Sequence, residues 1–205
     1  MEIISSCVGR CFRFPLGFRE VEEPMPGRGV LVSHETVRRW CAKCGQACAA
    51  ADPGDTWHLD EVFVKIGGVR HYLWRAVHRH GNVLDILLQS RRDARAAQRF
   101  LAKLMKKQRR VPQVLVTDQL RSSGVAHREV MPSVEHRCHR GLNNGAENSH
   151  RPPRQRERAM KGFRSVGAAQ RFLAAFGGFS SHFRPRRHRM TAPEYRTEMT
   201  LRFAI

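Results

Sequence analysis

The chain has 205 residues, and its 37 Lys and Arg residues outnumber 18 Asp and Glu residues to give a formal net charge of +19 at pH 7. This length suits one main domain with a small accessory domain, and such a charge favours nucleic acid as the partner over a membrane surface, because no basic amphipathic helix stands out. No segment is apolar for the length of a membrane span, and the N-terminus lacks a secretory signal pattern, so we expect a cytoplasmic, nucleoid-associated protein.

Residues 1–48 predict a small all-α domain. Apolar residues at helical spacing indicate one helix over residues 1–14. Residues 18–44 then fit a helix-turn-helix, with a first helix over 18–23 and a second over 34–40. An ordinary helical hairpin with solvated charges would show the same pattern, so both interpretations stay open.

The second of these helices would carry the DNA contacts. Ser33 is placed to cap it, because a serine side chain can accept a hydrogen bond from the first helical turn. Val37 and Trp40 would pack inward, while Arg38 and Arg39 would face DNA.

The six cysteines are expected to be free thiols, because a cytoplasmic chain does not keep disulfides. Cys41, Cys44 and Cys48 resemble half of a zinc site, whose second half would have to come from residues 136–139. The same spacing places the three cysteines on one face of a helix, so helical packing explains them equally well.

Residues 49–56 form a predicted linker to a catalytic α/β core over residues 57–180. Runs rich in β-branched and aromatic residues at 57–66, 69–77 and 83–88 are separated by short turns. This pattern predicts an antiparallel meander.

A helix and a buried strand continue the core. Apolar residues at helical spacing predict a helix over 93–107, and the apolar run 114–117 predicts a strand of the parallel type. A helix over 122–130 and a strand over 134–138 follow. The order predicts an RNase H-like, integrase-type mixed sheet flanked by helices.

The C-terminal part is basic. A helix is predicted to begin at Ser165 and to stop at Gly177–Gly178, and residues 181–205 would form a basic tail. Residues 151–189 hold eleven Lys or Arg against one acid, Glu157, which predicts a phosphate-binding face in preference to a merely solvated surface.

Three acids occupy informative places. Asp60 lies within the first strand, Asp118 ends the strand at 114–117, and Glu147 lies near the start of a helix. A carboxylate in a sheet must be paired or hold a metal, and strand alternation points Glu61 away from the face of Asp60. Three carboxylates from separate elements in a basic chain predict a metal-dependent enzyme that acts on nucleic acid.

Several motifs stand in order along the chain: VSHETVRRW (32–40), WHLDEVFVK (57–65), YLWRAV (72–77), RRDA (91–94), VTD (116–118), LNNGAENSHR (142–151) and FRPRRH (183–188). Together they resemble the DDE transposases of bacterial insertion sequences, and most closely the insertion-sequence-six family. The resemblance covers nearly the whole chain, and several motifs in the right order are specific where one alone would be weak.

The resemblance implies that Asp60, Asp118 and Glu147 are the catalytic and metal-binding acids, holding two Mg²⁺ ions, or Mn²⁺. It implies a DNA transposase in which water frees a 3′-OH at the element end, and this hydroxyl attacks target DNA without a covalent protein intermediate. The partners would be double-stranded DNA, both terminal inverted repeats and target, bound by a homo-oligomer.

Basic residues after the third acid would contact DNA. Arg154 matches a basic residue of the family and is assigned to phosphate contact, and Arg156, Arg158 and Lys161 extend the predicted contact. Asn143 and Asn144 are expected to cap the helix of the third acid, and Pro152–Pro153 to interrupt it.

The histidines at 136, 139 and 150 are expected on the surface or facing DNA, because three carboxylates already make a complete set of hard ligands.

The chain departs from the family pattern at Pro24, Pro26, His78, Gln119 and Ser123, none of which is a predicted metal ligand. Two alternatives follow: a transposase relic that only binds DNA, and a nuclease of the same fold that cuts without joining. Strand transfer by pre-cleaved DNA ends distinguishes a transposase from both.

Overall fold

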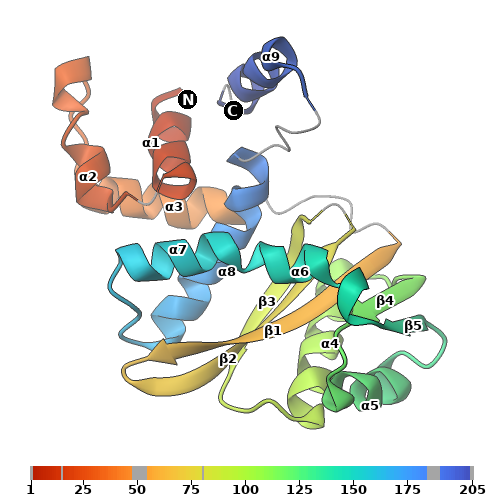
Figure 1. Cartoon of the computed structure of the whole chain (residues 1–205). Coiled ribbons are helices and arrows are strands. Elements are labelled where there is room, and N and C mark those ends of the chain that lie inside the picture. The colour runs from red at the N-terminus through yellow and green to blue at the C-terminus, as the bar shows by residue number, and fades with distance from the viewer. Residues whose placement is uncertain (1, 15, 48–54, 80, 184–189, 204–205) are drawn as a thin grey trace.

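The computed structural model describes residues 2–14, 16–47, 55–79, 81–183 and 190–203 (Figure 1). The N-terminal part comprises α1 (Glu2–Arg13), α2 (Phe18–Glu22), the 3-10 turn η1 (Pro26–Arg28) and α3 (His34–Ala47). The core comprises β1 (Thr56–Ile66), β2 (Val69–His78), β3 (Val83–Gln89), α4 (Ala94–Gln108), β4 (Val114–Thr117), α5 (Arg121–Val130), β5 (Glu135–Cys138), η2 (Arg140–Leu142), α6 (Asn144–Ser149), α7 (Arg151–Ala159) and α8 (Val166–Phe183). The helix α9 (Ala192–Phe203) follows.

The five strands form one mixed sheet in the order β3-β2-β1-β4-β5. β1 pairs antiparallel with β2 and parallel with β4, and β4 pairs parallel with β5. The predicted meander, crossover helix and parallel strands are therefore confirmed, and with them the RNase H-like mixed sheet flanked by helices.

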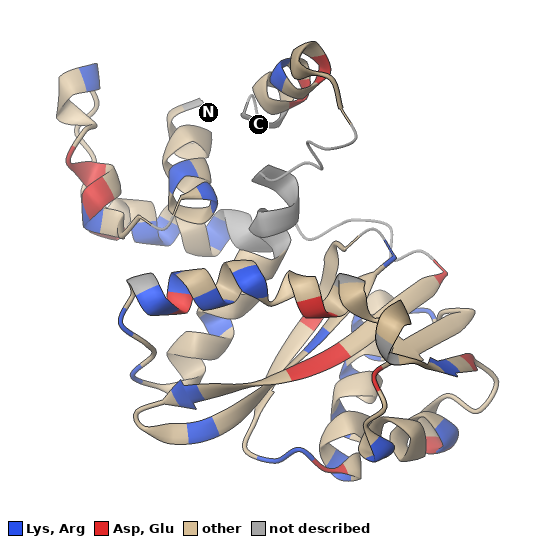
Figure 2. Ribbon diagram, in the orientation of Figure 1, with Lys and Arg blue, Asp and Glu red and all other residues tan. Residues whose placement is uncertain are grey.

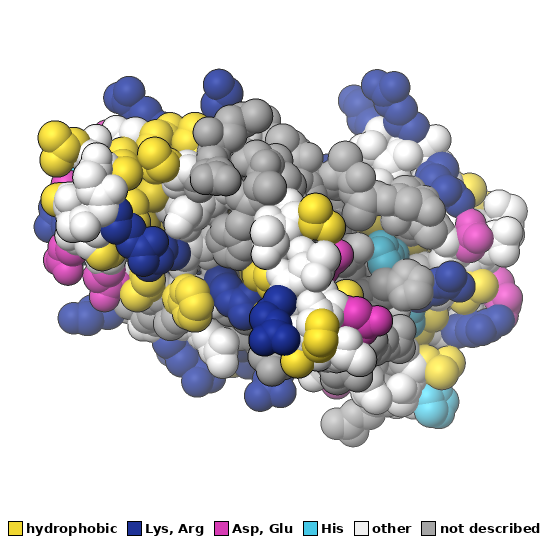
Figure 3. All heavy atoms as spheres, turned by 90° about the horizontal axis from the view of Figure 1, so that it is seen from above, with side chains coloured by type: hydrophobic (Ala, Val, Ile, Leu, Met, Phe, Trp, Pro, Cys, Tyr) yellow, Lys and Arg dark blue, Asp and Glu magenta, His cyan; other side chains and the backbone are white. Residues whose placement is uncertain are grey.

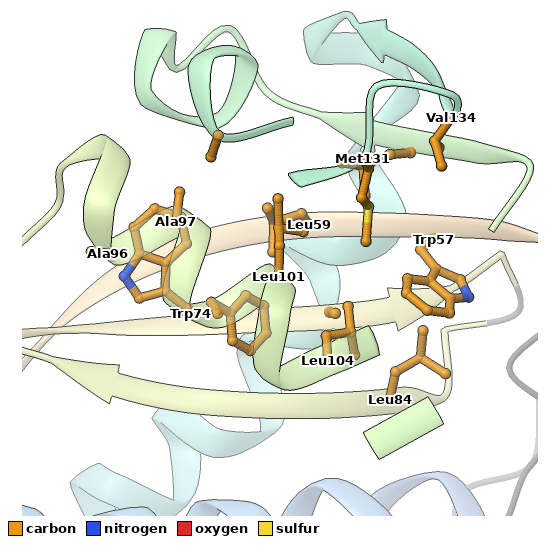
Figure 4. Packing of buried hydrophobic residues seen from close by; sticks show 14 residues of the cluster. Trp57, Leu59, Trp74, Leu84, Ala96, Ala97, Leu101, Leu104, Met131 and Val134 are labelled. Atoms are coloured by element: carbon orange, nitrogen blue, oxygen red, sulfur yellow. The ribbon is translucent and has the colours of Figure 1, made fainter. Parts of the chain in front are cut away.

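One face of the sheet packs against α4. Trp57 and Leu59 of β1 and Trp74 of β2 are fully buried against Leu101 and Leu104 of that helix (Figure 4). Asp93 begins α4 as its N-cap by accepting a hydrogen bond from Ala96 N at 2.8 Å.

The other face packs against α8. Val64, Ile66 and Leu73 of the β1–β2 hairpin contact Ala169 and Leu173 in a second buried cluster. Strand alternation explains the division, because successive residues of β1 point to opposite faces. Asp60 therefore lies on the face that α6, α7 and α8 cover (Figure 1).

The outer edge of the sheet at β3 is covered. Lys103 and Lys107 of α4 donate to the carbonyl oxygens of Ile86 at 2.8 Å and Leu84 at 3.0 Å. From the other face, the Gln170 side chain accepts from Leu88 N at 2.8 Å. Side chains thus occupy backbone groups that an edge strand would otherwise present to another strand.

Helix α8 does not end at Gly177–Gly178, and this prediction is wrong, because the helix continues to Phe183. A Cβ atom at Gly177 would lie 3.0 Å from Cγ1 of Val83. The glycine therefore allows the helix to approach β3 closely, and its packing role was mistaken for a helix stop.

The N-terminal helices pack on α8 through a third cluster that includes Cys7, Cys11, Cys41 and Phe176. As predicted, the helix after Ser33 is capped, since Thr36 N donates to Ser33 Oγ at 3.2 Å. Its DNA-binding role stays a prediction, as does the domain division, since residues 48–54 lie outside the described residues.

Three described cysteines, Cys7, Cys11 and Cys41, pack in this apolar cluster, whereas Cys138 is exposed on β5. Cys41 is buried there, whereas the side chain of Cys44 and all of Cys48 lie outside the described residues. Over the described part of the chain, the one group of side chains arranged to hold a metal lies elsewhere and contains no cysteine.

The described part of the predicted basic C-terminal tail contains the helix α9. α9 contacts α1 and α8, and Arg13 donates to the Tyr195 hydroxyl at 2.5 Å. Among the described residues, no helix has the length and apolarity needed to cross a membrane.

Candidate active site

The register of the sheet brings two predicted acids together. Leu59 of β1 lies opposite Thr117, the last residue of β4, so Asp60 and Asp118 follow from paired positions. Ligand oxygens of Asp60, Glu61 and Asp118 all lie within 4.8 Å of one another. The centre of the candidate site is therefore a group of three carboxylates at the end of β4.

Glu61 was missed as a member of this group, because strand alternation places it on the face opposite Asp60. Asp118 follows Thr117, the last residue of β4 that pairs with β1. Immediately beyond this pair, no described strand lies beside β1 on its β4 side to divide one face of the sheet from the other. Both neighbouring acids of β1 can reach Asp118 there. The adjacent acidic pair in the sequence was the available signal.

Glu61 is buried and is held by Arg92, whose Nη2 lies 2.6 Å from Glu61 Oε1. Burial raises the pKa of the Glu61 carboxyl to about 7; the charge of Asp118 adds to this, Arg92 opposes it, and Asp60 contributes a smaller increase. Such repulsion among carboxylates is what a bound cation would relieve.

Asp118 is fixed from the side of α5 and β5. Its Oδ1 accepts a hydrogen bond from Leu120 N at 3.1 Å, and its backbone oxygen accepts from Cys138 Sγ at 3.0 Å. Thr117 contacts His136 Nε2 through its hydroxyl at 2.9 Å. His136 is half-buried against His127, and this burial is the main cause that lowers its pKa.

Asp60 is held from the helical side. His150, at the junction of α6 and α7, places Nε2 3.2 Å from Asp60 Oδ2. The expectation that His150 lies on the surface is wrong, because its exposed fraction is 3%. Burial lowers the pKa of the His150 imidazole, against a smaller raising effect of Asp60.

Arg75 lies opposite Asp60 in the β1–β2 register and is also buried. Burial lowers the pKa of its guanidinium to about 10. Its Nε and Nη1 atoms have no hydrogen-bond partner among the described residues. The strand register thus places a buried cationic residue opposite a buried acidic one.

Glu147 lies outside the group of three carboxylates. It is exposed on α6, which packs over β1 and β2 (Figure 1). Asn143 precedes the helix and is fully buried, and its Nδ2 donates to Leu59 O at 2.9 Å. Asn143 holds the N-cap position, but its side chain anchors the helix to the strand of Asp60 and makes no capping bond.

The predicted DNA contacts divide into exposed and buried residues. Arg154, Arg158 and Lys161 are exposed on or just after α7, whose ribbon is marked by several arginine positions (blue in Figure 2). Arg156 is only 4% exposed, donates to Phe14 O at 3.4 Å and lies over the Phe172 ring. Its predicted DNA contact is therefore corrected to a packing role, since periodicity turns it toward the N-terminal helices.

Arg38 and Arg39 are exposed on α3, as predicted. Both lie near Glu35, with Arg38 Nη2 at 2.5 Å and Arg39 Nε at 3.7 Å from its Oε1 atom. Exposed pairs of this kind contribute little to stability, so the arginines remain available to other anions. Pro152 and Pro153 do interrupt the helix, because α7 begins as a separate helix at Arg151 with proline in its first turn.

Comparison with known proteins gives consistent matches. A family model described as a DDE domain matches residues 54–186. The transposase for insertion sequence element IS257 in transposon Tn4003 of Staphylococcus aureus is 35% identical over 161 residues, covering 73% of this chain and 71% of the relative. The transposase for insertion sequence-like element IS431mec of S. aureus strain Mu50 is 34% identical over the same shares of each chain.

A structural match is the simian T-cell lymphotropic virus intasome in complex with PP2A regulatory subunit B56 gamma. Its TM-score is 0.48 at 14% sequence identity, and the match covers 60% of this chain and 48% of that chain.

Proposed function

Because the chain belongs to the insertion-sequence-six family of DDE transposases, we propose that it cleaves the ends of its element and joins the freed 3′-OH to target DNA. The observation that carries the proposal is the convergence of Asp60 and Asp118 at the end of β4. Family membership indicates the type of reaction, and the convergence of Asp60 and Asp118 indicates where in this chain it would occur.

The donor set fits divalent magnesium. Asp60, Glu61 and Asp118 offer hard carboxylate oxygens close to one another, which is the ligand type that Mg²⁺ and Mn²⁺ prefer. We propose two ions, held by Asp60 and Asp118 with Glu61 beside them and Glu147 as the third acid of the family motif. Bound ions would supply positive charge for the attacking and leaving oxygens of an in-line displacement.

The chain's own residues prepare this site. Arg92 orients Glu61, Leu120 N orients one oxygen of Asp118, and His150 contacts Asp60 from the start of α7. Such partners restrict a carboxylate to one orientation and so lower the cost of ligand ordering.

The exposed residues of α7 and its end would bind substrate. Arg154, Arg158 and Lys161 are positioned to bind phosphate groups of double-stranded DNA, both the terminal inverted repeats and the target. Arg38 and Arg39 would add contacts from α3. We propose a homo-oligomer that joins two DNA ends and acts on nucleoid DNA in the cytoplasm.

A strand-transfer assay tests the function. Labelled, pre-cleaved duplexes with the inverted repeats that flank the reading frame should be joined to plasmid DNA by the wild type in Mg²⁺ or Mn²⁺. Asp118→Asn should abolish joining while leaving DNA binding intact, and Asp55→Asn, which changes an exposed aspartate just before β1, should retain joining.

Two results would contradict the proposal. Joining by Asp118→Asn at the wild-type rate would remove the acids from the chemistry. Cleavage of uncut ends without any joining of pre-cleaved ends would indicate a nuclease.

A further inference from the structure

A cavity of about 460 Å³ lies between the N-terminal helices and the core. It is formed by α3, α8 and the turn that joins α7 to α8, with contributions from the end of α1 and the start of α2. Aromatic and basic side chains share its lining, namely Phe12, Phe18, Phe172, Arg38, Arg164 and Arg171. We refer to it as the interhelical cavity. Apart from Arg38, no residue of its lining has a role in the proposed function.

The cavity presents aromatic surface that the fold does not fully cover. Phe18 and Phe172 are half-buried, whereas Phe12 behind them is buried. The rings of Phe12 and Phe172 stack with their centroids 6.5 Å apart and their planes at 22°. A flat apolar group entering the cavity would therefore meet supported aromatic side chains.

The turn at one wall is fixed in place. Phe163 O accepts a hydrogen bond from Gly67 N at 3.0 Å, and Phe163 forms a parallel bridge with Ile66. Arg164 follows directly, so its backbone is tied to the β1–β2 hairpin. The wall is preorganised, which lowers the ordering cost of binding.

The charges at the cavity are suited to an anion. Arg164 and Arg171 are exposed and make no ion pair within the described part of the chain, whereas Arg38 is bridged to Glu35. Hydrophobic and basic side chains also lie beside one another over the N-terminal helices, on the left of Figure 3. The exposed cations of α7 lead toward the same turn, because Arg158 lies near the end of α7 and Lys161 lies in the turn itself.

We propose that the interhelical cavity binds one unpaired nucleotide of the DNA substrate. The base would lie against Phe18 and Phe172, and the phosphates on either side of it would contact Arg164 and Arg171. Nucleic acids combine a flat aromatic group with closely spaced anions, and proteins bind unpaired bases through aromatic stacking next to cationic side chains. The inference rests on the proposed function in taking DNA as the ligand.

The proposal can be tested by replacing an alanine of α8 that lines the cavity with tryptophan, and by making the same change at an alanine outside the cavity as a control. Both Ala168 and Ala174 are exposed, but only Ala168 lines the cavity. The probe is a duplex with one extrahelical 2-aminopurine nucleotide, compared with the fully paired duplex. The wild type should bind the bulged duplex about tenfold more tightly, in the range of one stacked base.

Ala168→Trp should remove this preference and leave affinity for the paired duplex unchanged, and Ala174→Trp should keep it. The fluorescence of 2-aminopurine should change on binding to the wild type and to Ala174→Trp only. Equal affinity of the wild type for both duplexes would overturn the inference, as would a preference that survives in Ala168→Trp.

A charge change gives a second test that needs no large side chain. Arg171→Glu should weaken binding of the bulged duplex more than Arg95→Glu, which alters an exposed arginine on the opposite face of the sheet. Equal losses in the two variants would contradict a phosphate contact at the cavity. Strand transfer with paired ends reports on the proposed function separately, so loss of the bulge preference alone leaves that function standing.

Discussion

The aspartates on the sheet and the glutamate on α6 are held in different ways. Asp60 and Asp118 are placed by the paired register of β1 and β4, so the backbone itself sets their distance. Glu147 is carried by a six-residue helix, which Asn143 ties to Leu59 and His150 to Asp60. The comparison teaches that two of the proposed ligands are fixed by the backbone before any substrate arrives, while the position of the proposed third depends on a few side-chain contacts.

The largest expected effect is the loss of strand transfer in variants of Asp60 and Glu147, which should differ in how strongly they bind metal. Asp60→Asn and Glu147→Gln should each lower strand transfer by about a thousandfold or more, because metal catalysis contributes several kcal/mol and 1.4 kcal/mol is tenfold. In DNA-free protein, however, Asp60→Asn should weaken Mn²⁺ binding by more than about tenfold and Glu147→Gln by less than about twofold. Titration calorimetry measures the Mn²⁺ affinity of each variant. Equal weakening in the two variants would contradict the idea that the sheet holds its acids in place before Glu147 contributes.

The next effect concerns the carboxyl of Glu61, which is buried and lies beside Asp118 and Asp60. The pKa of Glu61 is about 7 in the fold against an ordinary value of 4.5. Below both values the group is protonated in the folded and unfolded states. As the pH rises between them, the unfolded chain ionises first, so the free energy of unfolding falls.

Glu61→Gln removes this loss of stability. In EDTA, the free energy of unfolding of the variant relative to the wild type should increase by up to about 3 kcal/mol between pH 4.5 and pH 8. Urea denaturation at a series of pH values measures the difference. Parallel pH profiles for the two proteins would show that burial and the charges of Asp118 and Asp60 do not raise the pKa of this carboxyl.

The attachment of α6 can be weakened without touching an acid. Asn143→Leu leaves the buried carbonyl of Leu59 without its donor, and this should cost about 1–3 kcal/mol of stability. Strand transfer should fall as well, because the helix of Glu147 loses its anchor. Asn144→Leu, at an exposed position next in the chain, serves as the control for urea denaturation and strand transfer. Equal losses of stability and strand transfer in the two variants would show that Asn143 does not anchor α6.

The smallest effect is expected from the exposed basic residues beside the helix-borne acid. Arg154→Ala should weaken binding of double-stranded DNA by about two- to tenfold and reduce its salt dependence by about one phosphate contact. The stability of the protein should change by less than about 0.5 kcal/mol. Fluorescence anisotropy across a salt series measures the change. The buried Arg156→Ala should instead destabilise the fold, and the reverse pattern would contradict the assignment.

Local signals in the sequence were sufficient for the sheet and most helices. Runs rich in β-branched and aromatic residues, separated by short turns, predict β1 to β3. Asp93 marks the start of α4 because a cap is a contact between near neighbours in the chain. The convergence of Asp60 and Asp118 was also predictable, since parallel strands of this fold align their ends.

Residues that depend on tertiary packing were not predictable in the same way. The placement of Glu61 depends on where β4 ends, and the burial of His150 and Arg156 depends on how α7 sits between the sheet and the N-terminal helices. The pair Gly177–Gly178 is typical of a helix C-terminus, but Gly177 instead packs against Val83 of β3. Such contacts join segments far apart in the chain, and no local pattern encodes them.

The covered edge at β3 has a consequence for how copies of the protein can gather around DNA. With Lys103, Lys107 and Gln170 already bonded to that strand, two molecules cannot fuse their sheets there into one continuous ribbon. Assembly must then use the opposite edge at β5 or the helical and loop surfaces, and Asp60, Glu61 and Asp118 stay within one copy. In the proposed homo-oligomer, each DNA end would then meet the acids of a single copy.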